Sequence, residues 1–367
     1  MRTKIKLGDL GKIITGKTPP TKISDNWNGD IMFITPKDIQ SGKNILKTER
    51  YITKQGIESV KSVILPPNAV CVSCIGNIGY VGMTTKTCIT NQQINSIIVN
   101  EKNDANYTYY LIKSLWPMFK KYEGQSTALS ILNKYQFSNI EVDVPTVDEQ
   151  KKIASVLVSI DNLIENNNAI NDNLQQQAFA RFGSMFPNIT DGERTIGDYI
   201  TPRRGKNLLS KDAMGGEVPV VAGGLEPATF HNVANTIAPV LTISASGANA
   251  GFVNLWHIPV WCSDSSFIDF TMTNNVLFWY VLLKRRQKEI FDSQTGSAQP
   301  HIYPQHIAAM RISELDNAVI EQYVEEVTPL FKLIGANMTE NIKLSSLRDV
   351  LLPKLMSGEI DVSNIEI

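Results

Sequence analysis

The chain repeats itself once, and this repeat limits the folds that it can adopt. KLGDLGKIITGKT at residues 6–18 returns as TIGDYITPRRGKN at residues 195–207, and both segments end on Gly-Lys and a polar residue. Five more pairs follow in the same order: SCIGNIGYV (73–81) and SASGANAGFV (244–253), TNQQINSII (90–98) and SDSSFIDFT (263–271), NYTYYLIKSLW (106–116) and NVLFWYVLLKR (275–285), GQSTALSIL (124–132) and TGSAQPHIY (295–303), VDEQKKIASVLVSID (147–161) and VIEQYVEEVTPLFKL (319–333). The period of about 170–190 residues is too long for a solenoid, so we expect one domain-sized unit, duplicated and diverged.

Each copy is predicted to contain a strand-rich part followed by helices. Residues 1–100 and 195–272 hold short apolar runs such as AVCVSCIG and PVLTISA, which Gly, Pro and Asn interrupt. Such runs are typical of strands. A helix of mixed character is expected at roughly 105–122 and again at roughly 274–292. A longer helix then closes each copy.

The long helices carry apolar side chains at heptad spacing. A helix of this kind packs lengthwise against a partner helix, and the other copy supplies one. About 35–40 helical residues at ~1.5 Å each would span about 55 Å. The predicted packing positions are Ile153, Val156, Ile160, Leu163, Asn167, Ile170 and Leu174 in the first helix, and Val327, Leu330, Ile334, Asn341 and Leu344 in the second.

Three polar or breaking residues in these helices leave alternatives open. Asn167 and Asn341 either fix the register of the helix pair or lie at its solvated edge. Pro329 predicts either a kink or a second helix that begins just before it, because proline lacks a backbone N–H.

Charge is unevenly distributed along the chain, although the formal net charge is only −1. Residues 1–145 hold 18 basic and 11 acidic side chains, and residues 188–313 hold 10 of each. Residues 146–187 hold 3 basic and 5 acidic side chains, and residues 314–367 hold 4 and 10. A basic block suits phosphate neutralisation, whereas acidic helical segments suit protein docking better.

Cysteine content and hydropathy favour a reducing, cytoplasmic setting. Only four cysteines occur in 367 residues. No signal peptide is recognised, and no apolar run approaches the ~18 residues that a membrane span requires. We therefore expect a cytoplasmic protein that has no membrane partner.

Residues 11–18, GKIITGKT, satisfy the phosphate-loop pattern G-x-x-x-x-G-K-[ST]. Such a loop needs a buried strand before it and a helix that begins at the Lys-Thr. The preceding segment is charged, and Pro19 and Pro20 follow, which disfavours helical geometry at Thr18. The repeat also replaces Gly11 by Ile200. We favour a short strand and a turn at Gly16, and a nucleotide hydrolase that uses Gly11–Thr18 remains the alternative.

No metal site or catalytic constellation is predicted. Cys71 and Cys74 could form half of a zinc site, but no second Cys or His pair lies nearby, so strand cysteines are favoured. The Asn/Asp-Pro-Pro-aromatic motif of an adenine methyltransferase is absent, and the four histidines are scattered.

Polar and glycine residues near the expected strand ends have two interpretations. A glycine turn at Gly76 either only reverses the chain or lets a DNA backbone approach closely, since glycine has no Cβ. Asn91, Gln92 and Gln93 either read base edges, as amides can grip adenine, or hydrogen-bond the strand-loop core. Their partners in the repeat are taken as Asp264, Ser265 and Ser266.

Two further groups are weighed in the same way. Ser126 with Thr127, and the segment 299–301, favour a turn over a base contact. The basic runs at residues 202–206 and 284–286 either contact phosphate or lie on solvated faces.

Several segments are typical of one known family. They are KLGDLGKIITGKTPP, ITPKDI (34–39), CIGNIGYVG with TNQQIN, and TGSAQPHI before a helix. More specific are VPTVDEQKKIASVLVSID, its echo AVIEQYVEEV, and the terminal LLPKLMSGEI (351–360). In their order and duplication they resemble, over essentially the whole chain, the specificity subunits of type I restriction-modification systems.

The resemblance implies an α+β fold with a pseudo-twofold internal repeat. Two strand-rich globular target-recognition domains, residues 1–145 and 188–313, would be separated by two long antiparallel coiled-coil helices, residues 146–187 and 314–367. Each domain would read one half of a bipartite, asymmetric site in double-stranded DNA. The chain would have no catalysis and no cofactor of its own. It would dock methylation subunits, two of them, that use S-adenosylmethionine, and through the complex restriction subunits that use ATP and magnesium.

Candidate DNA contacts follow from the resemblance and from the residues above, and a coiled-coil scaffold without a DNA role is a further alternative. The candidates are Lys17, Thr18, Lys37, Asp38, Gly76, Asn77, Gln92, Gln93, Ser126, Thr127, Arg203, Arg204, Lys206, Gly247, Asn249, Ser265, Lys284, Arg285, Arg286, Gln299 and His301.

Overall fold

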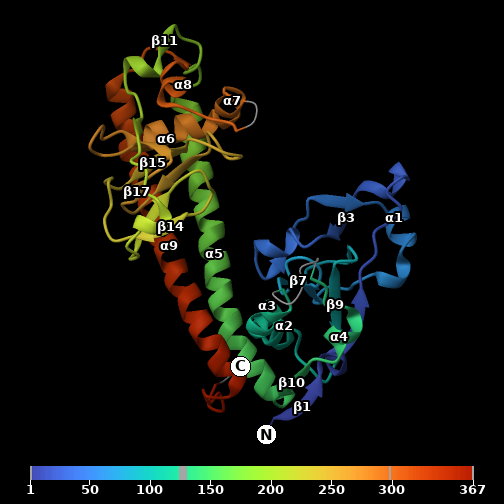
Figure 1. Ribbon diagram of the computed structural model, residues 1–367. Helices are drawn as coiled ribbons and strands as arrows, with labels where there is room; N and C mark the ends of the chain where they lie inside the picture. Colours follow the sequence, from blue (N-terminus) through green and yellow to red (C-terminus); the bar gives the residue numbers. More distant parts are fainter. Residues whose placement is uncertain (1, 124–129, 297–298, 366–367) are drawn as a thin grey trace. The chain divides into compact units, whose positions relative to one another are not determined.

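The computed structural model describes residues 2–123, 130–296 and 299–365 (Figure 1). It divides into two compact units: unit 1 comprises residues 1–165 and 342–367, and unit 2 comprises residues 166–341. Each unit contains a strand-rich part and one section of each long helix. These helices are α5 (Val147–Met185) and α9 (Asn317–Ser357).

Unit 1 is built on two sheets and one separate strand pair. The larger sheet has the order β2-β9-β6-β7-β4, the smaller sheet has the order β5-β3-β8, and β1 pairs with β10. The strands are β1 (Thr3–Lys6), β2 (Gly11–Thr15), β3 (Trp27–Ile34), β4 (Asn44–Ile45), β5 (Arg50–Ile52), β6 (Val70–Ser73), β7 (Val81–Thr84), β8 (Ile89–Thr90), β9 (Ile94–Val99) and β10 (Glu141–Val144). Its other α-helices are α1 (Lys54–Glu58), α2 (Ala105–Ser114), α3 (Trp116–Glu123) and α4 (Lys134–Ser138).

Unit 2 repeats this topology, except that no strand within its described residues corresponds to β4. Its larger sheet has the order β12-β18-β15-β16, its smaller sheet the order β14-β13-β17, and β11 pairs with β19. The strands are β11 (Arg194–Thr195), β12 (Arg203–Arg204), β13 (Val218–Val221), β14 (Thr229–His231), β15 (Val240–Ser244), β16 (Val253–Trp256), β17 (Trp261–Cys262), β18 (Ser265–Ile268) and β19 (Arg311–Ile312). Its other α-helices are α6 (Val276–Arg285), α7 (Gln287–Asp292) and α8 (Pro304–Ala308).

The helix expected after each set of strands is in fact two helices. In unit 1 the break falls at Leu115, and Pro117 follows as the second residue of α3, where a missing N–H is tolerated. In unit 2 the break falls at Arg286, whose backbone leaves helical geometry. The single helices predicted over roughly 105–122 and 274–292 are therefore wrong in this respect.

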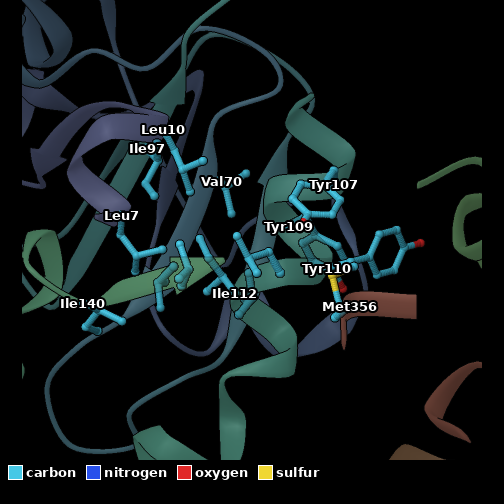
Figure 2. Packing of buried hydrophobic residues seen from close by; sticks show 14 of the residues in the cluster. Leu7, Leu10, Val70, Ile97, Tyr107, Tyr109, Tyr110, Ile112, Ile140 and Met356 are labelled. Carbon is cyan, nitrogen blue, oxygen red and sulfur yellow. The ribbon is translucent and has the colours of Figure 1, made fainter. Parts of the chain in front are cut away.

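The core of unit 1 lies between its larger sheet, α2 and the long helices (Figure 2). Alternating side chains of β6, such as Val70 and Val72, face this core, while Cys71 faces a second apolar cluster on the other side. Tyr107 and Tyr110 of α2 are almost fully buried in the same core. Burial of this apolar surface is the main source of stability of the unit.

The helix sections run antiparallel within each unit. In unit 2, Asn167 Nδ2 donates to Asn341 Oδ1 at 3.0 Å, and Asn337 Nδ2 donates to Asn171 Oδ1 at 2.8 Å. From the first of these bonds to the second, residue numbers rise on α5 and fall on α9, so the two sections run antiparallel. The two seam asparagines thus bond each other, which is the arrangement that fixes register.

The heptad positions are not buried uniformly. Leu163 and Ile170 are exposed, at 52% and 38% of their surfaces, so the expected packing at these two positions is wrong. A straight helix drifts away from a seven-residue repeat, and the strand-rich parts also select which face is buried. Among the remaining positions, Ile153, Ile160, Asn167, Val327 and Ile334 are buried, whereas Val156, Leu174, Leu330, Asn341 and Leu344 are half-buried.

Pro329 lies inside α9 and does not begin it, so the alternative of a helix start at this position is wrong. The flanking residues Val327 and Phe331 are buried in the core of unit 2 and hold the helix through the proline.

Among the helices of the described ranges, none combines the length and the apolar character that crossing a bilayer demands.

One buried histidine of unit 2 is expected to make the stability of that unit depend on pH. His257 packs against α9 at Gly335, where a Cβ would lie only 2.8 Å from the imidazole, and it stacks on Phe331. Burial lowers the pKa of His257 from 6.5. The unfolded chain therefore takes up this proton more readily, and stability is lost as the pH falls below about 6.5.

We expect the free energy of unfolding of unit 2 to decrease from about pH 7.5 to about pH 5.5, and His257→Gln to remove part of this decrease. Hydrogen exchange of α6 amides, followed across this range, measures the effect. An unchanged pH dependence in the variant would show that His257 does not cause it.

Candidate nucleic-acid interface

Both units carry a glycine loop at the same end of the larger sheet. In unit 1 it joins β6 to β7, and Gly76 and Gly79 adopt φ values of 77° and 97°. In unit 2 it joins β15 to β16, and Gly247 and Gly251 adopt 82° and 86°. A Cβ at Gly76 or Gly247 would meet no atom within 4 Å, so lack of space does not require glycine there. The positive φ of the backbone does.

The chain before α4 or α8 lies beside each glycine loop. The Gly76 amide donates to Ser130 O at 3.1 Å, and the Gly247 amide donates to Pro300 O at 3.0 Å. The candidates on the loops are Asn77, which is exposed, and Asn249, which is half-buried. The predicted pair Ser126 and Thr127 lies outside the described residues.

The GKIITGKT segment forms β2 and a turn, and it does not cradle a phosphate. The Gly16 amide donates to Ile94 O at 3.0 Å, and the Lys17 amide donates to Thr90 O at 2.9 Å. The amides that a phosphate loop would offer to a nucleotide are thus bonded within the protein. A Cβ on Gly11 would overlap Ile98 O, so this glycine serves strand packing. These contacts favour the strand and turn over a nucleotide hydrolase at these residues.

The same turn exists in unit 2, where the Gly205 amide donates to Ser265 O at 2.8 Å and the Lys206 amide donates to Cys262 O at 3.0 Å. Lys17 and Lys206 are both exposed. We call three segments the rim of each unit: the turn, the glycine loop and the loop before β9 or β18. They are residues 14–18, 74–80 and 91–93 in unit 1, and residues 203–207, 245–252 and 263–264 in unit 2.

These hydrogen bonds correct the alignment of the two copies. Ile94 and Ser265 accept from equivalent amides, so Ser265 corresponds to Ile94 and not to Gln92. One residue fewer separates β17 from β18 than separates β8 from β9. Ser265 is fully buried, and its hydroxyl donates to Val221 O at 3.1 Å. Ser265 is therefore a core residue and leaves the set of candidate DNA contacts.

Apart from Lys17, the rim of unit 1 presents neutral polar side chains. Thr18 Oγ1 donates to Gln92 Oε1 at 2.7 Å, and Gln92 is exposed. Asn91 is buried, and its Nδ2 donates to Gln93 Oε1 at 2.8 Å. Gln92 thus remains accessible, whereas Asn91 holds the loop and Gln93 is half-buried beside it.

Charged side chains form the rim of unit 2. Arg204 Nη2 lies 2.5 Å from Asp264 Oδ1, and the other oxygen of Asp264 accepts from Ser246 Oγ. Next to this pair, Arg203 is exposed and its Nη1 donates to Thr271 Oγ1 at 3.2 Å. Sequence patterns did not single out Ser246, although its position directly before Gly247 was a usable signal.

The remaining candidates of this region differ in exposure. His301 is half-buried and stacks on Tyr303, and Gln299 is exposed. In unit 1, Lys37 is exposed and pairs with Glu49 at 2.8 Å. Asp38 is buried and accepts hydrogen bonds from the amides of Thr35 and Glu49, so it closes a turn.

The basic run at 284–286 is used inside unit 2. Lys284 Nζ donates to Val253 O at 2.7 Å, and Arg285 Nη1 donates to Phe179 O at 2.9 Å. Arg286 is buried, pairs with Glu289 and donates to Arg311 O. Because these cations already hold the fold together, we remove all three from the candidate phosphate contacts.

The half zinc site is also excluded. Cys71 and Cys74 belong to different apolar clusters, on opposite sides of β6. Burial raises the pKa of the Cys71 thiol to about 12 and that of Cys74 to about 11, which disfavours the thiolate that binds zinc. Across the described residues, no three His, Cys, Asp or Glu side chains gather as a metal site would require.

Comparison with known proteins assigns the family. Residues 3–176 match the family model of the type I restriction modification DNA specificity domain. Over 98% of its length the chain is 27% identical to the type I restriction enzyme MjaIX specificity subunit of Methanocaldococcus jannaschii, and it covers 94% of that protein. Residues 3–176 belong to the type I DNA specificity-domain family. Members of this family recognise DNA and are not themselves catalytic.

Two further relatives agree with this assignment. The chain is 35% identical to the type I restriction enzyme HindI specificity subunit of Haemophilus influenzae, over 44% of this chain and 36% of that protein. The crystal structure of a type I restriction-modification system S subunit from M. genitalium matches with a TM-score of 0.61 at 19% identity, over 97% of this chain and 96% of that chain. The latter comparison shows that the chain has the α+β fold of that protein.

Proposed function

We propose that this chain is a type I specificity subunit and reads a bipartite, asymmetric site in double-stranded DNA, with each rim contacting one half of the site. One observation carries the proposal: the same backbone rim is built twice, with neutral polar side chains beside Lys17 in unit 1 and an arginine–aspartate pair beside Lys206 in unit 2. Two copies of one scaffold with different surface chemistry suit the reading of two different sequences.

The proposal assigns residues 1–145 and 188–313 as the recognition domains. The first carries 18 basic and 11 acidic side chains, which favours phosphate contacts. The proposed contacts in unit 1 are Lys17, Thr18, Lys37, Gly76, Asn77, Gln92 and Gln93. Those in unit 2 are Arg203, Arg204, Lys206, Gly247, Asn249, Gln299 and His301.

We further propose that the segments 146–187 and 314–367 dock methylation subunits, two per chain, and that restriction subunits join through that complex. Both segments are acidic and largely helical. S-adenosylmethionine, ATP and magnesium would bind to those partners.

Replacing residues 188–313 by the corresponding domain of another family member should change one half of the recognised sequence and leave the other half intact. The measurement is selection from a randomised duplex library by the chain complexed with its methylation subunit. The unmodified complex serves as the control for both halves. A change in both halves or in neither would overturn the modular assignment, and a complex that binds no duplex at low salt would support the scaffold alternative.

A further inference from the structure

We propose that Arg204 reads a guanine in the DNA half-site of unit 2, and that Asp264 is the positioning residue that presents its guanidinium. The inference rests on the proposed function and specifies which base one rim residue recognises. It gives Arg204 a different role from a phosphate contact, and the surrounding contacts distinguish the two roles.

The Arg204 guanidinium is hydrogen-bonded to the protein at one edge, and the side chain is partly exposed to solvent. It lies on β12, an edge strand, opposite Ser266 of β18. Its side chain is 42% exposed, and Nη2 bonds Asp264 Oδ1 at 2.5 Å. Within the described ranges no other protein acceptor bonds this guanidinium, so the rest of its planar array of N–H groups is available to a ligand.

Asp264 is itself fixed to the glycine loop by two contacts. Its second carboxylate oxygen accepts from Ser246 Oγ, and its backbone oxygen accepts from the Ala245 amide at 3.2 Å. Ala245 and Ser246 directly precede Gly247 at the tip of the rim. The orientation of Arg204 is therefore tied to the loop that we place against DNA.

The neighbouring carboxylate decides what kind of acceptor Arg204 suits. A phosphate bound to Arg204 would lie close to the negative charge of Asp264 and would be repelled. The major-groove edge of guanine is uncharged and offers O6 and N7, two acceptors that match the fork of an arginine. A phosphate contact also requires no fixed orientation, whereas reading a base does.

Unit 1 carries different residues on the same backbone. Thr15 pairs with Asn95 as Arg204 pairs with Ser266, and Thr15 Oγ1 donates to Asn95 Oδ1 at 2.6 Å. Gln93 O accepts from the Cys74 amide as Asp264 O accepts from Ala245. Arg204 and Asp264 therefore have no charged counterparts at the equivalent positions of unit 1. This is expected of residues that read only one half-site.

The test uses three variants of the full chain in complex with its methylation subunit: Arg204→Lys, Asp264→Asn and the control Arg194→Lys, which changes an exposed arginine of unit 2 outside the proposed contacts. Each selects from a randomised duplex library, and affinities are then measured for the best site and for that site with one guanine replaced. Thermal unfolding without DNA checks that each variant is folded.

We expect Arg204→Lys to keep the charge but lose one guanine preference, with an affinity loss of about 10- to 100-fold for the guanine site and little change for the substituted site. Asp264→Asn should weaken the same preference, and Arg194→Lys should leave it intact. If Arg204→Lys weakens binding equally for all sequences, or if the Arg204→Lys and Asp264→Asn motifs match the parent motif, the inference is overturned. If the parent selects no motif, the proposed function fails first and the inference falls with it.

Discussion

Replacing Arg348 by methionine is expected to lower the free energy of unfolding of unit 1 by about 3 kcal/mol, because it leaves a buried carboxylate without its cation. Arg348 lies on α9 and its Nη1 donates to Asp161 Oδ1 of α5 at 2.9 Å. The Asp161 side chain is only 8% exposed. Its other oxygen accepts from Tyr110 of α2 at 2.5 Å. Three helices of unit 1 therefore meet at this carboxylate.

The surrounding charges support this magnitude. Burial and the nearby Asp161 charge raise the pKa of the Tyr110 hydroxyl, so that hydroxyl remains a donor. Lys43 is buried beside Tyr109 and Tyr110, and burial lowers its pKa. The Asp161 charge acts in the opposite direction on that pKa, so Lys43 offsets part of the loss, and the expected value lies at the lower end of the range for a broken buried pair.

Hydrogen exchange of α2 and of the section of α5 in unit 1 measures the loss locally, which avoids assuming that both units unfold together. Lys343→Met, at an exposed position of α9, is the matched control. Replacing Asp161 by leucine together with Arg348→Met should recover much of the stability, since removing both charges removes the desolvation penalty. A loss below about 1 kcal/mol in the single variant would mean that the pair behaves as an exposed ion pair.

The duplicated organisation could be predicted from sequence because each sheet follows local apolar runs that occur twice in the same order. The runs AVCVSCIG and PVLTISA became β6 and β15, which occupy the same place in their sheets. The register between the copies could not be predicted in this way. The loop before β18 is one residue shorter than the loop before β9, so the residues of β18 correspond to different residues of unit 1 than the sequence alignment suggests. Only the strand hydrogen bonds reveal this shift.

Candidate contacts were least predictable where long side chains fold back onto the protein. The sequence KRR at 284–286 is the same whether its cations reach solvent or bond Val253 O, Phe179 O and Arg311 O. Conversely, the contact of Ser246 with Asp264 joins residues 18 positions apart and has no periodic signal. The glycines at 76 and 247 were predictable because a positive φ restricts the residue type itself.

Gly16→Ala is expected to destabilise unit 1 by about 3 kcal/mol or more, and Gly205→Ala to do the same to unit 2. A Cβ on Gly16 would overlap the backbone oxygens of Thr90 and Asn91. On Gly205 it would overlap Ser263 O and lie 2.5 Å from Cys262 O. Backbone oxygens in a sheet cannot move aside as flexible side chains can, so the turn or the strand after it must shift.

Each variant should lose amide protection in its own unit only, as measured by hydrogen exchange over β9 and β18. Gly224→Ala is the matched control, because its Cβ would meet no atom closer than 3.4 Å. The result also discriminates between the two interpretations of GKIITGKT. If Gly16 served a nucleotide, Gly16→Ala would abolish ATP binding by a protein of parental stability, and Gly205→Ala would have no comparable effect. Equal losses of stability in the two copies would instead show that the Gly-Lys pair is retained for the packing of one turn against one sheet, built twice.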